Sequence, residues 1–221
     1  NILIYKYTQI SGRCCGGSPT GNAVMRVAVI PARGGSKRIP RKNIKLFCGK
    51  PMIAWSIAAA VESNCFDRII VSTDDEEIAD VAKHHGAEVP FVRPSELADD
   101  HTGTIAVVRH TVHWLNAIGQ TPIQVCCIYA TAPFVRAADI RRGLNIMVSA
   151  DSDYAFSVTS YPFPIQRALR ITNRGRVEMF SPECFNIRSQ DMEEAYHDAG
   201  QFYWGRATAW LTGEIIFGPN A

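Results

Sequence analysis

Residues 27–43 read VAVIPARGGSKRIPRKN. The first four, Val27 to Ile30, form a continuous apolar run that ends at Pro31, which is typical of a strand buried on both faces of a sheet. The remainder places two glycines, a serine, five cations and an asparagine between Ile30 and Asn43. The stretch therefore predicts a buried strand that opens into a glycine-rich, basic loop.

Apolar patterns after this loop alternate between helical and strand spacing. We expect helices at 52–61, 78–84, 104–115 and 139–148, and strands at 69–71, 88–92, 124–129 and 155–159. This order predicts an α/β fold with a doubly wound, mostly parallel, Rossmann-like sheet. Ligands of such sheets bind at the carboxyl ends of the strands, where the loops of this chain also carry its polar residues.

The composition changes after Tyr154. Beyond one more expected strand, the chain is rich in Pro, aromatic and polar residues, as at Pro162-Phe163-Pro164 and Arg188-Ser189-Gln190-Asp191. Such a segment suits a lid, a substrate platform or a dimerisation arm. We expect a smaller lid or dimerisation segment beside the main sheet.

Length and charge narrow the class of protein. The chain has 221 residues, of which 47% are hydrophobic, enough for one sizeable α/β core. Its net charge is only +2, from 23 basic and 21 acidic residues, so no global charge favours nucleic acid as a partner. Any anion-binding site must be local.

The cysteines and the hydropathy indicate a compartment. Seven cysteines cannot all pair, and none has C-x-x-C spacing, so neither a disulfide framework nor a zinc site is predicted. Cys126 and Cys127 lie in an apolar run, where a free cysteine acts as a small buried hydrophobe. No apolar stretch approaches the ~20 residues that cross a bilayer. We expect a cytoplasmic protein without a membrane partner.

Residues 1–24 differ from the rest of the chain. They begin without methionine and contain a loop-like segment at 11–19, whereas Met25 opens the strong strand pattern. We interpret Met25 as the natural start and residues 1–24 as an extension. The alternative, a secretory signal, needs an apolar core of ~7 or more residues after a basic patch, but Ile2 to Tyr5 is short and precedes Lys6.

The loop after the first strand has the composition of a phosphate site. Gly34 and Gly35 allow the backbone to approach a ligand and to turn its N–H groups towards an anion. Arg33 and Lys37 would neutralise phosphate oxygens. The spacing is neither the Walker pattern nor the G-x-G-x-x-G dinucleotide turn, which disfavours a dinucleotide-dependent oxidoreductase. A merely solvated basic loop is the alternative, and it would not explain glycines at a strand exit.

The loop resembles the signature R-x-x-S-K-x-x-x-x-K-N of the nonulosonate cytidylyltransferases, the family that includes the CMP-sialic acid synthetases. The resemblance extends from Met25 to about Trp210, through 66–74, 79–86, 93–100 and 102–104. It implies a nucleotide-diphospho-sugar transferase-like fold over 25–221 and a family that acts on CTP. Residues 1–24 lie outside the resemblance.

Later segments, 127–134, 156–167 and 194–205, are similar to family members that activate pseudaminic acid. Sialic acid synthetases carry a Q-P-T-S-P-like segment where this chain has Tyr129-Ala130-Thr131-Ala132-Pro133. The resemblance therefore implies transfer of CMP from CTP to pseudaminate, with release of diphosphate. The alternatives are the same reaction on N-acetylneuraminate and a non-catalytic CTP-binding fragment.

The resemblance also implies roles for individual residues. Arg33 and Lys37 are the expected catalytic residues, because they would hold the phosphates and neutralise the leaving pyrophosphate. The expected CTP-binding residues are Ala32, Arg33, Gly34, Gly35, Ser36, Lys37, Lys42, Asn43, Arg93 and Thr104. The expected sugar-binding residues are Tyr129, Thr131, Gln166, Arg188, Gln190, Tyr196, His197 and Gln201. Arg188 is the expected partner of the sugar carboxylate.

Simpler interpretations stand beside some of these roles. Arg93 could only cap a strand, and Tyr203 and Trp204 are favoured as packing residues. His197 beside Asp198 could form an acid–base pair, although neighbouring residues need not face each other. Asp74 and Asp75 could hold metal, but capping of the helix that starts near Glu76 is favoured.

The family resemblance implies Mg²⁺ or Mn²⁺ as cofactor and a homodimer. Its members end in a strand and helix with a D-x-D-T-x-x-D-like segment that supplies metal-binding carboxylates, and this sequence stops at Ala221 before such a segment. Since Mg²⁺ usually needs one or two carboxylates alongside nucleotide phosphates, the metal ligands stay unassigned. The expectation is a chain that binds CTP and turns it over poorly.

Overall fold

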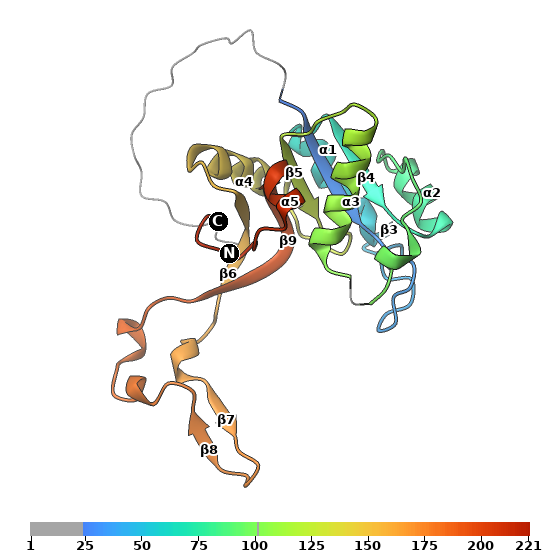
Figure 1. Cartoon of the computed structure of the whole chain (residues 1–221). Helices are drawn as coiled ribbons and strands as arrows, with labels where there is room; N and C mark the ends of the chain where they lie inside the picture. Colours follow the sequence, from blue (N-terminus) through green and yellow to red (C-terminus); the bar gives the residue numbers. More distant parts are fainter. Residues whose placement is uncertain (1–23, 101) are drawn as a thin grey trace. The chain divides into compact units, whose positions relative to one another are not determined.

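The structure is a computed structural model that describes residues 24–100 and 102–221. The described chain divides into two compact units, which we call the sheet unit, residues 24–156 and 200–221, and the insert unit, residues 157–199. Figure 1 shows the chain coloured along its sequence. The expected extension falls on residues outside the described range, apart from Val24. The insert unit begins close to Tyr154, where the composition of the sequence changes.

The main sheet has five strands in the order β4-β1-β5-β9-β6. The strands are β1 (Arg26–Pro31), β4 (Arg68–Ser72), β5 (Gln124–Ile128), β6 (Tyr154–Ser160) and β9 (Tyr196–Arg206). β1 is parallel to both β4 and β5, and β9 is antiparallel to β5. The α/β class is confirmed, with one antiparallel strand inserted into the predicted parallel arrangement.

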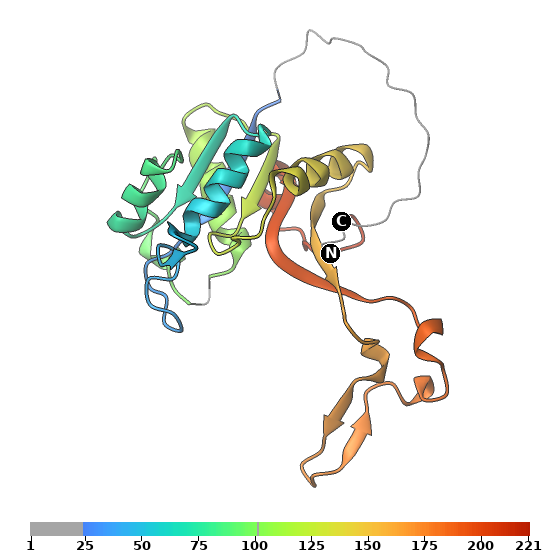
Figure 2. The same ribbon diagram turned by 180° about the vertical axis from the view of Figure 1, so that it is seen from behind.

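Helices cover both faces of this sheet. α3 (Thr104–Ala117) and α5 (Ala207–Thr212) pack together on the face turned to the viewer in Figure 1. α1 (Met52–Ser63) packs against α4 (Ala137–Ser149) on the opposite face, which Figure 2 shows from behind. α2 (Glu76–His84) contacts α1. Because both faces are covered, all four residues from Val27 to Ile30 are fully buried, as the apolar run predicts.

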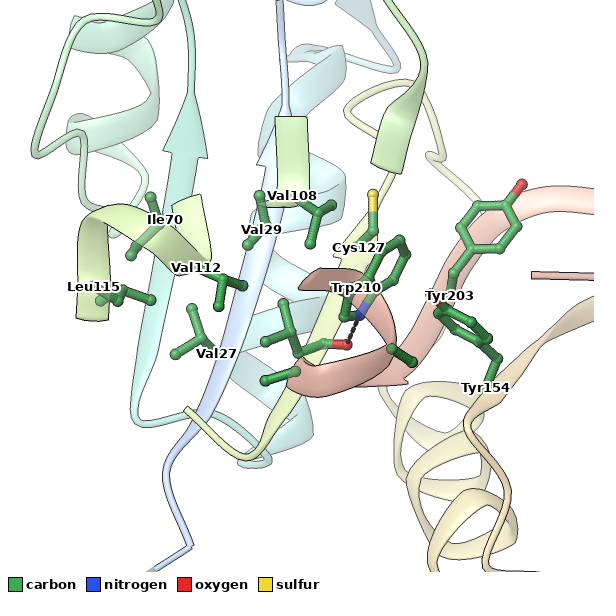
Figure 3. Packing of buried hydrophobic residues seen from close by; sticks show 13 residues of the cluster. Val27, Val29, Ile70, Val108, Val112, Leu115, Cys127, Tyr154, Tyr203 and Trp210 are labelled. Carbon is green, nitrogen blue, oxygen red and sulfur yellow. Dashed lines mark hydrogen bonds between the residues drawn. The ribbon is translucent and has the colours of Figure 1, made fainter. Parts of the chain in front are cut away.

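The core between the sheet and α3 is shown in Figure 3. Val27 and Val29 of β1 pack with Val108 and Val112 of α3 in one buried cluster. Trp210 joins this cluster, and its indole N–H donates to the carbonyl of Val125 at 3.1 Å, so a large aromatic is buried without an unpaired donor. This packing fixes the strand ends that carry the site.

Two elements differ from the expectation. The strand predicted at 88–92 forms only isolated bridges, Ile70 with Glu88 and Thr73 with Val92, because Pro90 has no N–H to donate to a ladder. β9 was not predicted as a strand, since its first half is polar and includes Gly200 at φ +61°. The other expected helices and strands are present within a few residues of their predicted bounds.

The remaining elements are short. The sheet unit has the hairpin β2 (Leu46–Phe47) and β3 (Lys50–Pro51), and the insert unit has the hairpin β7 (Leu169–Ile171) and β8 (Val177–Met179). Single 3₁₀ turns lie at 95–97, 165–167, 182–184 and 189–191. No helix in the described part of the chain has the length and hydropathy needed to cross a membrane.

Candidate active site at the carboxyl ends of the strands

A cavity of about 250 Å³ opens where β1 and β5 end. Its size is below the ~300–1,000 Å³ of sites for drug-sized ligands, so it suits one portion of a larger ligand. Its lining includes seven residues expected to contact CTP or the sugar: Arg33, Lys42, Asn43, Arg93, Thr104, Tyr129 and Thr131. The predicted position at the carboxyl ends of the strands is where the cavity lies.

A second cavity, of about 830 Å³, has Arg33, Lys42, Asp100 and Thr131 in common with the first. Its cations come from the loop after β1: Arg33, Lys37, Arg38, Lys42 and Lys45. Asp100 is the only carboxylate among its described lining residues. A hollow with five cations and one carboxylate is suited to a ligand that carries several negative charges.

Backbone contacts hold both ends of the loop after β1. Asn43 is buried at 3% exposure and donates from its side-chain amide to the carbonyl of Arg33 at 2.9 Å. The N–H of Ala32 donates to the carbonyl of Ser72 at 2.9 Å. Asn43 thus connects the two ends of the loop, which supports the cations between them.

Gly34 packs against the end of β4. Its N–H donates to Asp74 at 2.9 Å, and a Cβ at this position would lie 2.5 Å from Oδ2 of Asp75. Any side chain at position 34 would therefore displace the loop. A Cβ at Gly35 would meet nothing within 4 Å. In this structure the close approach at Gly34 is to protein carboxylates.

Asp75 serves two neighbours. Its carboxylate accepts the N–H of Ile78 at 3.0 Å and so caps α2, which confirms the capping interpretation. It also forms an ion pair with Arg41, whose φ is +55°. The Arg41 guanidinium and the capping N–H groups lower the pKa of Asp75. Asp75 is therefore a structural support for the loop.

Arg93 is a cation buried at 4% exposure. Its Nε donates to the hydroxyl of Ser72 at 3.0 Å, and its guanidinium also contacts the Ser72 carbonyl. Burial lowers the pKa of Arg93 to about 10, although the nearby Asp74 carboxylate opposes this effect. Arg93 stays protonated at neutral pH, its backbone N–H bonds to Thr73, and it also lines the first cavity. Ser72 was missed by sequence reasoning because it reads as one more strand residue.

Asp100 holds two of the expected phosphate-binding cations. Its Oδ1 lies 2.6 Å from Nη2 of Arg33, and its Oδ2 pairs with Nζ of Lys37. The hydrogen bonds from Lys37 and Arg33 lower the pKa of Asp100 to about 2. Sequence reasoning assigned Asp100 no role, since nothing in local spacing links it to a loop more than sixty residues earlier.

Tyr129 continues the wall of the first cavity beyond β5. Its hydroxyl lies 3.1 Å from Oγ1 of Thr104, while its backbone carbonyl accepts from Ser56 at 2.8 Å. Its N–H donates to the carbonyl of Gln201 on β9 at 2.9 Å. The side-chain oxygen of Gln201 is buried without a hydrogen-bond partner among the described residues, so it can accept from a ligand.

Five expected sugar-binding residues belong to the insert unit. There Gln166 donates to the carbonyl of Glu193 at 3.1 Å, and Arg188 donates to Asp191 at 2.8 Å. The other three are Gln190 in the 3₁₀ turn at 189–191, Tyr196, whose hydroxyl donates to Glu194, and His197. Nδ1 of His197 lies 2.9 Å from the backbone carbonyl oxygen of Asp198.

Packing is confirmed for the aromatic pair on β9. Tyr203 and Trp204 are 2% and 0% exposed. The Trp204 indole donates to the carbonyl of Ile140 at 2.8 Å and the ring stacks on Phe66 at a centroid distance of 5.0 Å. Trp204 thus fixes β9 against α4, whereas Tyr203 belongs to the buried cluster that contains Val108 and Val112 of α3.

The described residues do not gather the protein ligands of a divalent cation. Within 24–100 and 102–221, no three His, Cys, Asp or Glu side chains form a group that could hold a metal. Near the basic loop, Asp74 accepts the N–H of Gly34, and Asp75 and Asp100 are each paired with arginine. In the described structure, these three carboxylates near the loop are thus engaged with protein groups.

Comparisons with known proteins agree with this geometry. A family model described as Cytidylyltransferase matches residues 27–207. The pseudaminic acid cytidylyltransferase of Campylobacter jejuni subsp. jejuni serotype O:2 is 44% identical over 195 residues, covering 88% of this chain and 84% of that protein. The CMP-N,N'-diacetyllegionaminic acid synthase of Legionella pneumophila is 43% identical over 123 residues, covering 55% of this chain and 53% of that one.

A solved structure of CMP:2-keto-3-deoxy-manno-octonic acid synthetase complexed with CTP superposes with a TM-score of 0.63 at 19% identity. The match covers 86% of this chain and 77% of that chain. At this identity the likeness establishes the fold.

Proposed function

Because the chain belongs to the cytidylyltransferase family, we propose that it transfers the CMP group of CTP to a nonulosonic acid, with pseudaminic acid as the sugar. The observation that carries this is the 44% identity to a pseudaminic acid cytidylyltransferase over 88% of the chain. In the reaction the anomeric hydroxyl oxygen of the sugar forms a bond to the α-phosphorus. The bond from that phosphorus to the bridging oxygen breaks, pyrophosphate leaves, and the hydroxyl proton is released.

The two cavities divide CTP between them in this proposal. Cytosine and ribose occupy the first cavity, where Arg93 and Thr104 contact them and Asn43 supports the wall. The triphosphate lies across the shared wall and in the second cavity, where Arg33, Lys37 and Lys42 meet it. The loop residues Ala32 to Ser36 complete the proposed phosphate site. Within it, the N–H groups of Ala32 and Gly34 donate to Ser72 and Asp74 and so would support the loop.

Catalysis then rests on position and charge. In phosphoryl-type transfer the protein forms no covalent bond to the reactants. Most of the acceleration therefore comes from positioning the reactants and neutralising their charge. Lys37 and Arg33 face the charge that grows on the leaving pyrophosphate. The family's divalent cation, Mg²⁺ or Mn²⁺, would arrive with the triphosphate of CTP, which chelates it without the protein.

Each unit carries residues that we propose as contacts of the sugar. Tyr129, Thr131 and Gln201 belong to the sheet unit. The side-chain oxygen of Gln201 has no hydrogen-bond partner within the described part of the chain, which supports an acceptor role towards a sugar hydroxyl. Gln166, Arg188, Gln190, Tyr196 and His197 belong to the insert unit. Arg188 would exchange Asp191 for the carboxylate of the sugar.

The assembly proposed for this function is a homodimer. The insert unit carries large apolar side chains that are each more than half exposed: Phe163, Leu169, Ile171, Val177, Phe180 and Phe185. Such a surface suits a protein interface. Light scattering is expected to give twice the 24.4 kDa mass of the chain.

The compartment proposed for this function is the cytoplasm. The buried free thiols of Cys126 and Cys127 suit a reducing environment.

The proposed sugar is tested by comparing two sugars as substrates in parallel reactions. Pseudaminate and N-acetylneuraminate are supplied in parallel with CTP, and the CMP-sugar products are quantified by mass spectrometry. A preference for pseudaminate of at least tenfold in kcat/KM is expected. A tenfold preference for N-acetylneuraminate would replace pseudaminic acid in the proposal and leave the family chemistry intact.

A further inference from the structure

The carboxylate of Asp100 occupies the space between two loop cations. One oxygen contacts Nη2 of Arg33 at 2.6 Å and the other pairs with Nζ of Lys37. The arrangement copies one phosphate group, in which two oxygens each meet a cation. Since Asp100 is the only carboxylate among the described residues of the larger cavity, no other acid there can take over this contact.

We propose that Asp100 is a built-in competitor for the triphosphate of CTP, holding Arg33 and Lys37 until the phosphates displace it and retaking them when pyrophosphate leaves. The proposal rests on the assignment of these two cations to the phosphates under the proposed function. In this proposal Asp100 lowers the affinity of the site for every phosphate ligand.

The partners can exchange without a change of fold. The side chain of Lys37 is 83% exposed, and those of Arg33 and Asp100 are 27% and 29% exposed, so ligand and water reach all three groups. Asp100 has a short side chain, and rotation about its Cα–Cβ bond releases both cations. Only the ion pairs have to be broken.

Charge decides which ligands win the exchange. A carboxylate carries one negative charge, whereas a triphosphate or pyrophosphate carries several, so these ligands displace Asp100 more readily than a monophosphate does. Two unopposed cations would bind any phosphate, including the product pyrophosphate. Asp100 therefore favours ligands with several charges and speeds release of the product.

The test is the affinity for pyrophosphate, measured by calorimetry without divalent metal. Asp100→Asn is expected to bind pyrophosphate about three- to tenfold more tightly, since partly exposed ion pairs have modest strength. Asp100→Glu, which keeps the charge, is expected to stay within about twofold of the parent. Asp80→Asn makes the same change in net charge on the exposed side of α2 and is the control. Equal or weaker binding by Asp100→Asn, with the melting temperature retained, would overturn the proposal.

Two further variants separate this inference from the proposed function. Arg33→Ala and Lys37→Ala are expected to weaken pyrophosphate binding. If neither does, the phosphate site is wrong and Asp100 has nothing to compete for. If both weaken binding while Asp100→Asn does not tighten it, the phosphate site stands and only the competitor fails. Loss of metal-dependent turnover in Asp100→Asn with unchanged metal-free binding would instead make Asp100 a metal ligand.

Discussion

Nε of Arg93 donates to the hydroxyl of Ser72 at 3.0 Å, and both residues are buried where β4 ends beside the first cavity. The Ser72 carbonyl also accepts from Arg93 and from the N–H of Ala32. One strand-end residue thus positions both the buried cation and the start of the phosphate loop. Rigid placement of a charged group is what recognition of a base or ribose requires.

Replacing Ser72 with alanine is expected to loosen Arg93, because its Nε loses the hydroxyl acceptor while its contact to the backbone carbonyl of residue 72 stays. The KM for CTP should rise about three- to tenfold while kcat stays within about twofold. The loss of one hydrogen bond to a charged group costs ~1.5–3 kcal/mol, and the remaining contact of Arg93 to the carbonyl of residue 72 offsets part of this cost. Steady-state kinetics measures the split. Ser63→Ala is the matched control, since Ser63 is also a buried serine whose hydroxyl is hydrogen-bonded, in its case to the carbonyl of Ala60. An equal rise of KM in both variants would assign the effect to general destabilisation.

The two loop glycines should respond differently to alanine. Gly34→Ala would bring a Cβ within 2.5 Å of Oδ2 of Asp75, so the loop must shift and CTP binding should weaken at least about tenfold. Gly35→Ala meets nothing within 4 Å and should bind CTP within about twofold of the parent. Calorimetry on both variants measures the difference. Similar losses at the two positions would contradict the packing described for Gly34.

Lys37→Ala should affect turnover far more than stability. A charge that acts on the leaving pyrophosphate contributes chiefly in the transition state, so kcat should fall by ~10²-fold or more. The melting temperature should hardly move, because the side chain is 83% exposed. Lys83→Ala on α2 removes an equal charge and is the control. An unchanged kcat would leave Lys37 as a binding residue only.

The burial of Cys126 and Cys127 in the core can be tested by thiol labelling. Burial raises the pKa values of Cys126 and Cys127, both fully buried on β5, so neither forms the reactive thiolate at pH 8. Cys48 is exposed and should be labelled by a maleimide in the native protein. Peptide mapping by mass spectrometry distinguishes the sites, with labelling in denaturant as the positive control. Native labelling of Cys127 at the rate of Cys48 would contradict the packing of β5.

The sequence predicted the elements whose side chains alone identify them. β1, β4 and β5 are buried runs bounded by turn residues, and α1 to α4 have helical spacing. β9 was not predicted as a strand because its first residues are polar. Its position beside β5 depends on pairing across the sheet. The opposite error occurred at 88–92, where a strand was predicted and only isolated bridges form. The composition is that of a strand, but Pro90 has no N–H to donate to a ladder.

The sequence likewise predicted only the part of the site that local composition identifies. The basic loop comes directly after β1, so local composition was sufficient to select Arg33 and Lys37, and the family resemblance added Asn43. Ser72 and Asp100 could not be selected this way, because their roles come from contacts between residues far apart in the chain. Such contacts depend on the strand order, which sequence spacing does not contain.

The central claim is transfer of CMP to a nonulosonic acid, and ³¹P nuclear magnetic resonance tests it most directly. The protein is incubated with CTP, Mg²⁺ and pseudaminate, and the signals of CTP, pyrophosphate and the phosphodiester of CMP-pseudaminate are followed together. We expect pyrophosphate and the phosphodiester to appear in equal amounts as CTP disappears, and neither to appear without the sugar. Binding of CTP with no pyrophosphate at any Mg²⁺ concentration would contradict the claim and leave the chain as a nucleotide-binding protein.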